Sequence, residues 1–542
     1  MVHSIDIADV PSTTPLFADF WKGKEAFRSL LPRHFTDPRA FTEQAGILAG
    51  GRYDRRTLCA VLREQNERFG AGAETQAAIG ALGEPGSMVV IGGQQAGLFG
   101  GPLYTVHKAL TIMVLARRMQ KELGKPVIPV FWIASEDSDL AEVNHTFVVD
   151  RDGRLRELRL HEAAEAKLPV SRVRLGEEIG PLMDELAAAL PAAPGVEGIL
   201  ADLRAAYSPG RTYPQAFGTW MTSLFGEQGL VLVDPSDVRL KRMAHSLFER
   251  EIRENSPVST AVMAQTRRMM EAGYAPQIEL REGFLTLFLQ DPARQAIALR
   301  RNGFELKSTG KSFTMGELAA LLERSPESFT PNAVLRPLYQ DTLFPTLAAV
   351  LGPSEIAYFC QLTLAYQTMG IPMPIVFPRS SLTFIEPKME KLMSKLKVGL
   401  RDLLLRGDRV IDDILKRELP ESLNARISTG RTSVTETWKT IIDEIDALDP
   451  TLHRTAELGS GRALRQFDFM EKKIAQAARK KNGILRGQVE RLVAALAPRN
   501  GLQERTLAAL PYLARYGKRV LMQAAEGIDP FAPEHRGLVV DQ

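Results

Sequence analysis

Several residue types and patterns are scarce in this 542-residue sequence, and each shortage excludes a class of protein. The only cysteines are Cys59 and Cys360, too few for a disulfide scaffold or a cysteine-rich zinc or iron–sulfur site. Lys and Arg number 68 against 65 Asp and Glu. An excess of +3 does not favour a protein that binds nucleic acid through its phosphates.

Signals for export or membrane insertion are also lacking. The first residues do not show the basic region and apolar stretch of a signal peptide. No apolar run approaches the roughly 18 residues that a membrane-spanning helix needs. The low cysteine content fits a reducing compartment, so we expect a cytoplasmic protein. From the small net charge and the lack of a long apolar run, we expect no nucleic-acid partner and no membrane partner.

The strongest pattern present is a strand–loop–helix–strand unit that begins at Met88. An apolar run over 88–91 enters the loop GGQQAGLFGG, and a helix follows between Pro102 in its first turn and Gly124 at its end. The run VIPVFWIA, residues 127–134, then predicts a buried strand. Such a unit predicts two parallel strands and a right-handed crossover, hence an α/β protein built on a parallel sheet.

The rest of the chain divides around this core. Alternating residues about Asp152 and Gly153 predict a hairpin, and the period-two segment over about 277–307 predicts a second antiparallel insertion. The run 230–233 predicts another core strand. Two more strand-like runs, 333–335 and 373–377, end at Arg336 and Arg379 and flank a helical segment from about Ser354.

Beyond residue 385 strands disappear for over a hundred residues, and apolar residues recur at helical and heptad spacing. Such a seam must pack on a neighbouring helix or on a second subunit, so we expect a homodimer formed through C-terminal helices.

The whole chain is expected to divide into seven parts. They are N-terminal helices with the first half of the core (1–145), a first insertion (146–228), a core segment (229–270), a second insertion (271–330), core completion (331–384), a helical coiled-coil region (385–525) and a C-terminal tail (526–542).

Ligands of open parallel sheets bind at the carboxyl ends of the strands, and polar residues cluster there in this sequence. The glycine-rich loop offers glycines and two amide side chains, and the following helix offers a polar face that could meet an anion. The loop matches neither GxGxxG nor GxxxxGK, which argues against a dinucleotide fingerprint and a P-loop. The alternative is a solvated helix face beside a flexible turn. The candidates here are Gly93, Gln94, Gln95, Gly97, Tyr104, His107 and Lys108.

Carboxylates follow the second strand in the segment SEDSD. They could hold Mg²⁺, bind an amine or act as a general base, whereas the alternative is an acidic helix cap. Arginines near the later strands could clamp a carboxylate or phosphate, although Arg336 could equally form an ion pair with Asp341. The remaining candidates are Trp132, Glu136, Asp137, Asp139, Asn144, Asp234, Arg336, Gln340, Asp341, Glu355, Tyr358 and Arg379.

Five long segments stand out along the chain, in this order: GGQQAGLFGGPLYTVHKAL, PVIPVFWIASEDSDLAEVNH, GLVLVDPSD, NAVLRPLYQDTLFPTLAAVLGPSEIAYFCQL and FPRSSLTFIE. Together they resemble the BshC family of bacillithiol-biosynthesis cysteine-adding enzymes. The resemblance implies a ligase that joins cysteine to the amine of glucosaminyl-malate. It also implies a Rossmann-like core related to class I synthetases and nucleotidyltransferases, connecting-peptide insertions and a dimerising C-terminal coiled coil. The chain departs from the family pattern at three positions. It has Ser138 where the pattern has His, Gly100 where the pattern has Thr, and Leu351 where the pattern has Gly.

A carboxylate is a poor electrophile, so we expect activation of cysteine by ATP or another nucleotide, with Mg²⁺ as a possible companion whose ligands are unknown. Lys108 or His107 would neutralise developing charge, and Arg336 and Arg379 would clamp the malate carboxylates. Glu136, Asp137 and Asp139 would orient Mg²⁺ or the amine. Two other hypotheses stay open: a metal-dependent hydrolase using the acidic loop, although the sequence lacks a histidine cluster, and a noncatalytic coiled-coil adaptor with a nucleotide-binding core.

Overall fold

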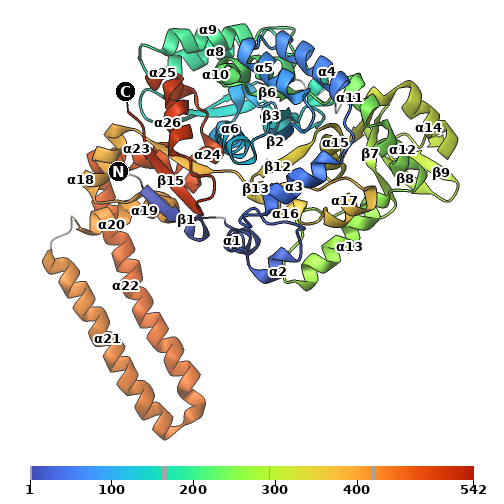
Figure 1. The fold of residues 1–542 in the computed structure, drawn as a ribbon. Coiled ribbons are helices and arrows are strands. Elements are labelled where there is room, and N and C mark those ends of the chain that lie inside the picture. The colour runs from blue at the N-terminus through green and yellow to red at the C-terminus, as the bar shows by residue number, and fades with distance from the viewer. Residues whose placement is uncertain are drawn as a thin grey trace. The chain divides into compact units, whose positions relative to one another are not determined.

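The computed structural model describes residues 3–11, 13–160, 168–291, 293–417, 421–481 and 483–541. They fall into two units, Met1–Ile385 with Gln503–Gln542, and Glu386–Leu502. Figure 1 shows the helices and strands of both. Among the described helices, none is both long and apolar enough to cross a membrane.

The core of the first unit is a five-stranded parallel sheet in the order β13-β12-β2-β3-β6 (Figure 1). Its strands are β2 (Met88–Gln94), β3 (Val127–Ile133), β6 (Val231–Val233), β12 (Thr346–Leu351) and β13 (Ile375–Pro378). They are buried almost throughout, as parallel strands covered on both faces must be. The predicted parallel pair is therefore confirmed.

Helix α6 (Leu103–Leu123) connects β2 to β3 and contacts both. It ends at Gly124, which has φ +63°, as the predicted glycine stop requires. Because β2 pairs with β3 on one side and β12 on the other, the strand order changes direction there. Such a switch point opens a crevice at the carboxyl ends of the strands, where ligands of open α/β sheets bind.

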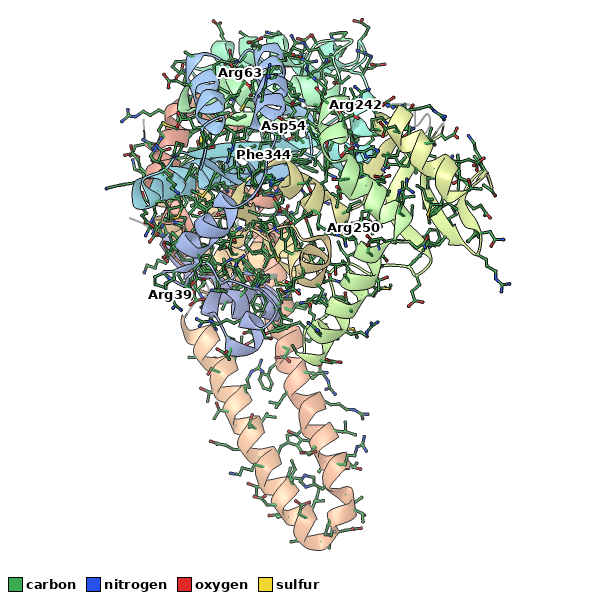
Figure 2. All side chains as sticks on the ribbon, turned by 45° about the vertical axis from the view of Figure 1, so that its right-hand side comes forward. Arg39, Asp54, Arg63, Arg242, Arg250 and Phe344 are labelled. Atoms are coloured by element: carbon green, nitrogen blue, oxygen red, sulfur yellow. The ribbon has the colours of Figure 1, made fainter. Side chains whose placement is uncertain are left out.

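Helices α3 (Ala40–Ala49), α4 (Arg55–Arg68) and α5 (Ala73–Leu82) also contact the sheet. Charged side chains occupy exposed positions of this layer, for example Arg39 just before α3 and Arg63 in α4. Phe344, which lies just before strand β12, is buried instead (Figure 2). Both cysteines are free and buried, where a thiol packs as a small apolar side chain.

The antiparallel strands predicted in both segments are confirmed. Strands β4 (His145–Val149) and β5 (Leu155–Arg159) form the first hairpin. The second insertion is a five-stranded sheet in the order β10-β9-β8-β7-β11. Its strands are β7 (Phe284–Gln290), β8 (Arg294–Arg300), β9 (Gly303–Leu306), β10 (Ser312–Phe313) and β11 (Phe329–Pro331).

The strand expected over 333–335 is wrong. The side chain of Asn332 accepts hydrogen bonds from the backbone N–H groups of Val334 and Leu335, which turns the chain into helix α15 (Leu335–Leu343). The strand that completes the core is β12, further along the chain, so Arg336 lies in the first turn of a helix.

The second unit contains the helices expected after residue 385, and α21 (Glu421–Leu448) packs along α22 (His453–Lys481) (Figure 1). Arg431 of α21 pairs with Asp468 and Glu471 of α22. The apolar seam is thus covered at least partly within one chain. The other α-helices of the second unit are α18 (Pro387–Leu396), α19 (Leu400–Arg406), α20 (Val410–Arg417) and α23 (Gly483–Leu496).

Residues 503–525, expected to belong to the coiled-coil region, instead lie in the first unit. The reason is local: Gln503 and Glu504 of α24 (Gln503–Thr506) are buried and hydrogen-bonded to β14 (Ser381–Ile385). Strand β15 (Glu534–Val539) then pairs between β14 and β1 (His3–Asp6). Along the chain, α24 is followed by helices α25 (Leu510–Tyr516) and α26 (Arg519–Gly527) and then by β15.

The loop between β2 and α6 needs glycine at position 100, one of the departures from the family pattern. Gly100 has φ +92°, and a Cβ there would lie 2.6 Å from Nε1 of Trp220. Its N–H donates to the hydroxyl of Tyr207, which in turn donates to the carbonyl of Gly97. The side chains of Trp220 and Tyr207 therefore leave no room for threonine in this chain.

We expect Gly100→Ala to lower the free energy of unfolding by roughly 2–4 kcal/mol, because backbone strain and overpacking add. Gly273→Ala is the matched control: Gly273 has φ +88° but no atom within 4 Å of its Cβ position. That variant should lose only about 1 kcal/mol from backbone strain. Denaturant midpoints measure both, and equal losses in the two variants would contradict the clash with Trp220.

Candidate active site

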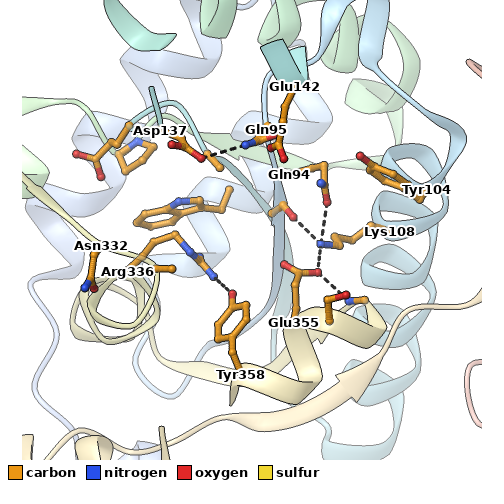
Figure 3. Close-up of a pocket in the computed structure, with 18 of the residues that line it drawn as sticks. Gln94, Gln95, Tyr104, Lys108, Asp137, Glu142, Asn332, Arg336, Glu355 and Tyr358 are labelled. Carbon is orange, nitrogen blue, oxygen red and sulfur yellow. Dashed lines mark hydrogen bonds and ion pairs between the residues drawn. The ribbon is translucent and has the colours of Figure 1, made fainter. Parts of the chain in front are cut away.

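A cavity of about 960 Å³ opens at the carboxyl ends of β2, β3 and β12 (Figure 3). Its lining combines the core loops with the first turn of α15, the N-terminal end of α16 (Pro353–Phe359), α24 and the second inserted sheet. The candidate residues that line it are Gly93, Gln94, Gln95, Tyr104, Lys108, Trp132, Glu136, Asp137, Arg336, Glu355, Tyr358 and Arg379. Segments more than two hundred residues apart along the chain thus meet at one site.

Lys108 is buried, and its ammonium group is fully used by the protein. Its Nζ donates to the carbonyl of Gly93 (2.6 Å), to Oε1 of Gln94 (3.0 Å) and to Oε2 of Glu355 (2.5 Å) (Figure 3). An ammonium has three N–H groups, so none is left for a ligand. Burial lowers the pKa of Lys108, and Glu355 opposes this. Lys108 therefore holds the β2 loop against α16, and the solvated helix face weighed as an alternative is not observed.

Arg336 is fixed by two neutral partners. Its Nη1 donates to Oε1 of Gln340 (3.3 Å) and its Nη2 to the hydroxyl of Tyr358 (3.0 Å). Gln340 is oriented in turn by donating to Asp341, whose pKa burial raises to about 6. Gln340 thus bridges Arg336 and Asp341, in place of the direct ion pair weighed as an alternative. A guanidinium has five N–H groups, so three are not engaged by Gln340 and Tyr358.

The guanidinium of Arg379 is paired inside the protein. Its Nη1 and Nη2 donate to the two carboxylate oxygens of Glu504 (3.0 and 2.6 Å), and Nδ1 of His107 lies 3.0 Å from Glu504. Burial acts to raise the pKa of Glu504, but Arg379 and His107 outweigh it and hold that pKa well below its usual range. His107 is fully buried in this cluster and does not line the cavity.

The acidic loop presents one buried and one exposed carboxylate to the cavity. Glu136 is buried and pairs with Lys241, whose Nζ also donates to the carbonyl of Phe329 (2.5 Å). Burial raises the pKa of Glu136, and Lys241 opposes this. Asp137 is exposed and accepts a hydrogen bond from Gln95 (Figure 3). Asp139 lies outside the lining, as does Ser138, so that departure from the family pattern does not touch the cavity.

The other candidates outside the lining have partners in the protein. The side chain of Asn144 donates to the carbonyl of Leu160 and accepts a hydrogen bond from Arg159. Asp234 accepts a hydrogen bond from the hydroxyl of Ser135 (2.6 Å). These groups shape the loops around the cavity. The candidates outside the lining are Gly97, His107, Asp139, Asn144, Asp234, Gln340 and Asp341.

The polar lining residues that were not among the sequence candidates include Arg294, Asn332 and Arg505. Arg294 lies in an inserted antiparallel strand and Arg505 in the segment assigned to the coiled coil. Neither position carries a local signal, because only the tertiary fold brings them to the core. Asn332 could have been found from its position four residues before Arg336.

The donor set fits a polyanionic ligand better than a transition metal. Within the described part of the chain, no three His, Cys, Asp or Glu side chains are grouped to hold a metal ion. A hydrolase of the catalytic-zinc type uses three such ligands. Magnesium bound mainly through nucleotide phosphates needs only one or two carboxylates, and Asp137 is available for that.

Two family models match the chain. They are described as bacillithiol biosynthesis BshC, N-terminal Rossmann-like domain, over residues 2–380, and its C-terminal coiled-coil domain, over 382–539. Curated relatives carry the name "Putative cysteine ligase BshC". The protein of Koribacter versatilis is 36% identical over 98% of both chains. That of Salinibacter ruber is 32% identical over 96% of this chain and 95% of its own. That of Bacillus velezensis is 31% identical over 86% of this chain and 87% of its own.

The parallel sheet and the switch-point cavity agree with the first description, and the helical second unit, Glu386–Leu502, lies within the residues matched by the second. Matches of this length leave no large part of the chain unassigned. Over nearly its whole length, this chain is therefore a member of the BshC family of bacillithiol-biosynthesis enzymes.

Proposed function

We propose that this chain joins the carboxyl group of cysteine to the amino group of glucosaminyl-malate in the cytoplasm, with a nucleoside triphosphate, ATP, as the activating co-substrate. The relatives named as cysteine ligases support the reaction class. The observation that carries the proposal is Arg336. It is a guanidinium fixed by neutral partners in a cavity that also presents carboxylates, so it suits an anionic substrate group beside a reacting amine.

The chemistry explains why two kinds of group are needed. Activation makes the cysteine carboxyl an acyl-phosphate or acyl-adenylate. The amine nitrogen attacks the acyl carbon, the C–O bond to the phosphate-bearing group breaks, and the nitrogen loses a proton. Glu136 is our proposed acceptor of that proton, because a buried carboxylate with a raised pKa is the stronger base. Asp137 would hold Mg²⁺ against the nucleotide phosphates, where the ion supplies charge neutralisation.

The remaining candidates receive roles from their contacts. Lys108 keeps Gln94 and Glu355 in place, and the Gln340–Asp341 pair keeps Arg336 in place. Arg379, proposed from sequence as a second carboxylate clamp, keeps only its N–H groups not engaged by Glu504 and Ser380 for that purpose.

The test is direct product formation. The purified full chain, supplied with cysteine, glucosaminyl-malate and Mg-ATP, should yield the amide-linked thiol, detected by its mass. Glu136→Gln should lower the rate about 100-fold or more if Glu136 accepts the proton. Omission of the nucleotide is the control: an unchanged rate without it would contradict the activation step, and no product under any condition would contradict the ligase.

We also propose that the chain forms a homodimer through its C-terminal helices. The described part of α22 leaves large apolar side chains exposed, which a second subunit could cover. They are Leu458 (54% exposed), Phe469 (52%) and Met470 (52%).

A further inference from the structure

Arg294 reaches the cavity from the second inserted sheet, outside the parallel core. Its guanidinium carbon lies 3.8 Å from the ring centroid of Phe288, so the group stacks on β7. Its Nε donates to Oγ1 of Thr330 (3.0 Å) and its Nη2 to the carbonyl of Pro331 (3.3 Å). Both acceptors are neutral and belong to β11.

The strand order explains how this side chain is held. Strand β7 lies between β8 and β11, and Phe288 pairs with Thr330 across the sheet. Arg294, at the start of β8, therefore extends over Phe288 to reach β11. Stacking on the ring and two hydrogen bonds along one edge fix the plane of the guanidinium, which lowers the entropy cost of binding a planar anion.

The charge of Arg294 has no close counter-ion in the described part of the chain. Burial lowers the pKa of Arg294. The negative charges of Asp137 and Glu136 oppose this only by electrostatic attraction across a distance. The other buried cations of the lining differ: Lys108 pairs with Glu355, and Arg379 pairs with Glu504. Arg336 shares the arrangement of Arg294, a fixed guanidinium with neutral partners.

We propose that Arg294 binds an anionic group of a substrate, a carboxylate or a phosphate, and so acts with Arg336 as the second of two anchoring cations. The inserted sheet then contributes directly to substrate binding. This inference rests on the proposed function for the identity of the substrates. The two sources of the anion, the malate moiety and the nucleotide, are separated by the experiment.

The experiment is a calorimetric titration of the full chain with glucosaminyl-malate and with ATP, each alone. In Arg294→Gln, the affinity for one of the two should fall about 10- to 100-fold, because charge-assisted hydrogen bonds are lost. Loss for glucosaminyl-malate identifies a carboxylate, and loss for ATP identifies a phosphate. Arg294→Lys keeps the charge without the planar fork, so we expect an intermediate loss for the same ligand.

Arg300→Gln is the matched control, since Arg300 lies on the same strand but is exposed and paired with Glu305. It should bind both ligands as the unmodified chain does. Unchanged affinities in Arg294→Gln, or a wild-type chain that binds neither ligand, would overturn the inference; if Arg294→Gln does not fold, the lysine variant decides in the same way. Because binding is measured without turnover, a chain that binds but forms no product contradicts the proposed function alone.

Discussion

Replacing Arg336 by alanine should lower kcat/KM for amide formation about 100- to 1,000-fold while leaving the fold intact. Arg336 lines the cavity, and removing one partner of a desolvated charge pair typically costs about 2–5 kcal/mol. Within the described part of the chain, two of the five N–H groups of Arg336 are used, by Gln340 and Tyr358. Steady-state kinetics with each substrate varied in turn gives the measurement.

Two further variants sharpen this expectation. Arg336→Lys should recover little of the loss, because an ammonium cannot reproduce the planar fork. Arg324→Ala, at an exposed position in the last turn of α14 (Met315–Arg324), should leave the kinetics unchanged. An Arg336→Ala enzyme with the wild-type kcat/KM would remove the observation on which the proposed function stands.

Replacing Glu504 by glutamine should destabilise the first unit by about 3–5 kcal/mol, because a buried charge then loses its counter-ion. Glu504 is 1% exposed and accepts hydrogen bonds from Arg379, Ser381 and the N–H of Leu382. Denaturant midpoints at neutral pH measure the loss. Glu526→Gln, on the exposed side of α26, is the control with no expected change.

The same carboxylate gives a pH dependence of defined sign. Its folded-state pKa lies below the unfolded value of about 4.3, so its contribution to stability is present above that pH and is lost as pH falls through the folded pKa. The stability difference between the wild type and Glu504→Gln should therefore narrow on acidification below about pH 4. A difference that stays constant over that range would show that the ionised form of Glu504 is not what stabilises the cluster.

The elements that sequence reasoning predicted correctly are those whose signals are local. Strands β2 and β3 are continuous apolar runs, and α6 carries Gly124 at its end. The hairpin of β4 and β5 was marked by the pair Asp152-Gly153. In each case the residues that specify the element lie within it or next to it.

The features that were missed depend on distant partners. Lys108 and His107 lie on a polar helix face that is buried because Glu355 and Glu504 come from far along the chain. Strand β12 was overlooked because its short run, TLAAVL, is rich in alanine and gains its identity from pairing with β2 and β13. Arg294 enters the cavity only because the inserted sheet lies against the core.

The return of the last forty or so residues to the first unit bears on how the protein is made. A ribosome completes β14 and Arg379 well before it reaches Glu504, so the nascent chain carries Arg379 without its counter-ion while the whole helical hairpin is synthesised. Arg505, the residue of this last segment that lines the cavity, can reach the site only near the end of translation. Chains released prematurely after residue 502 would thus lack both Arg505 and the counter-ion of Arg379.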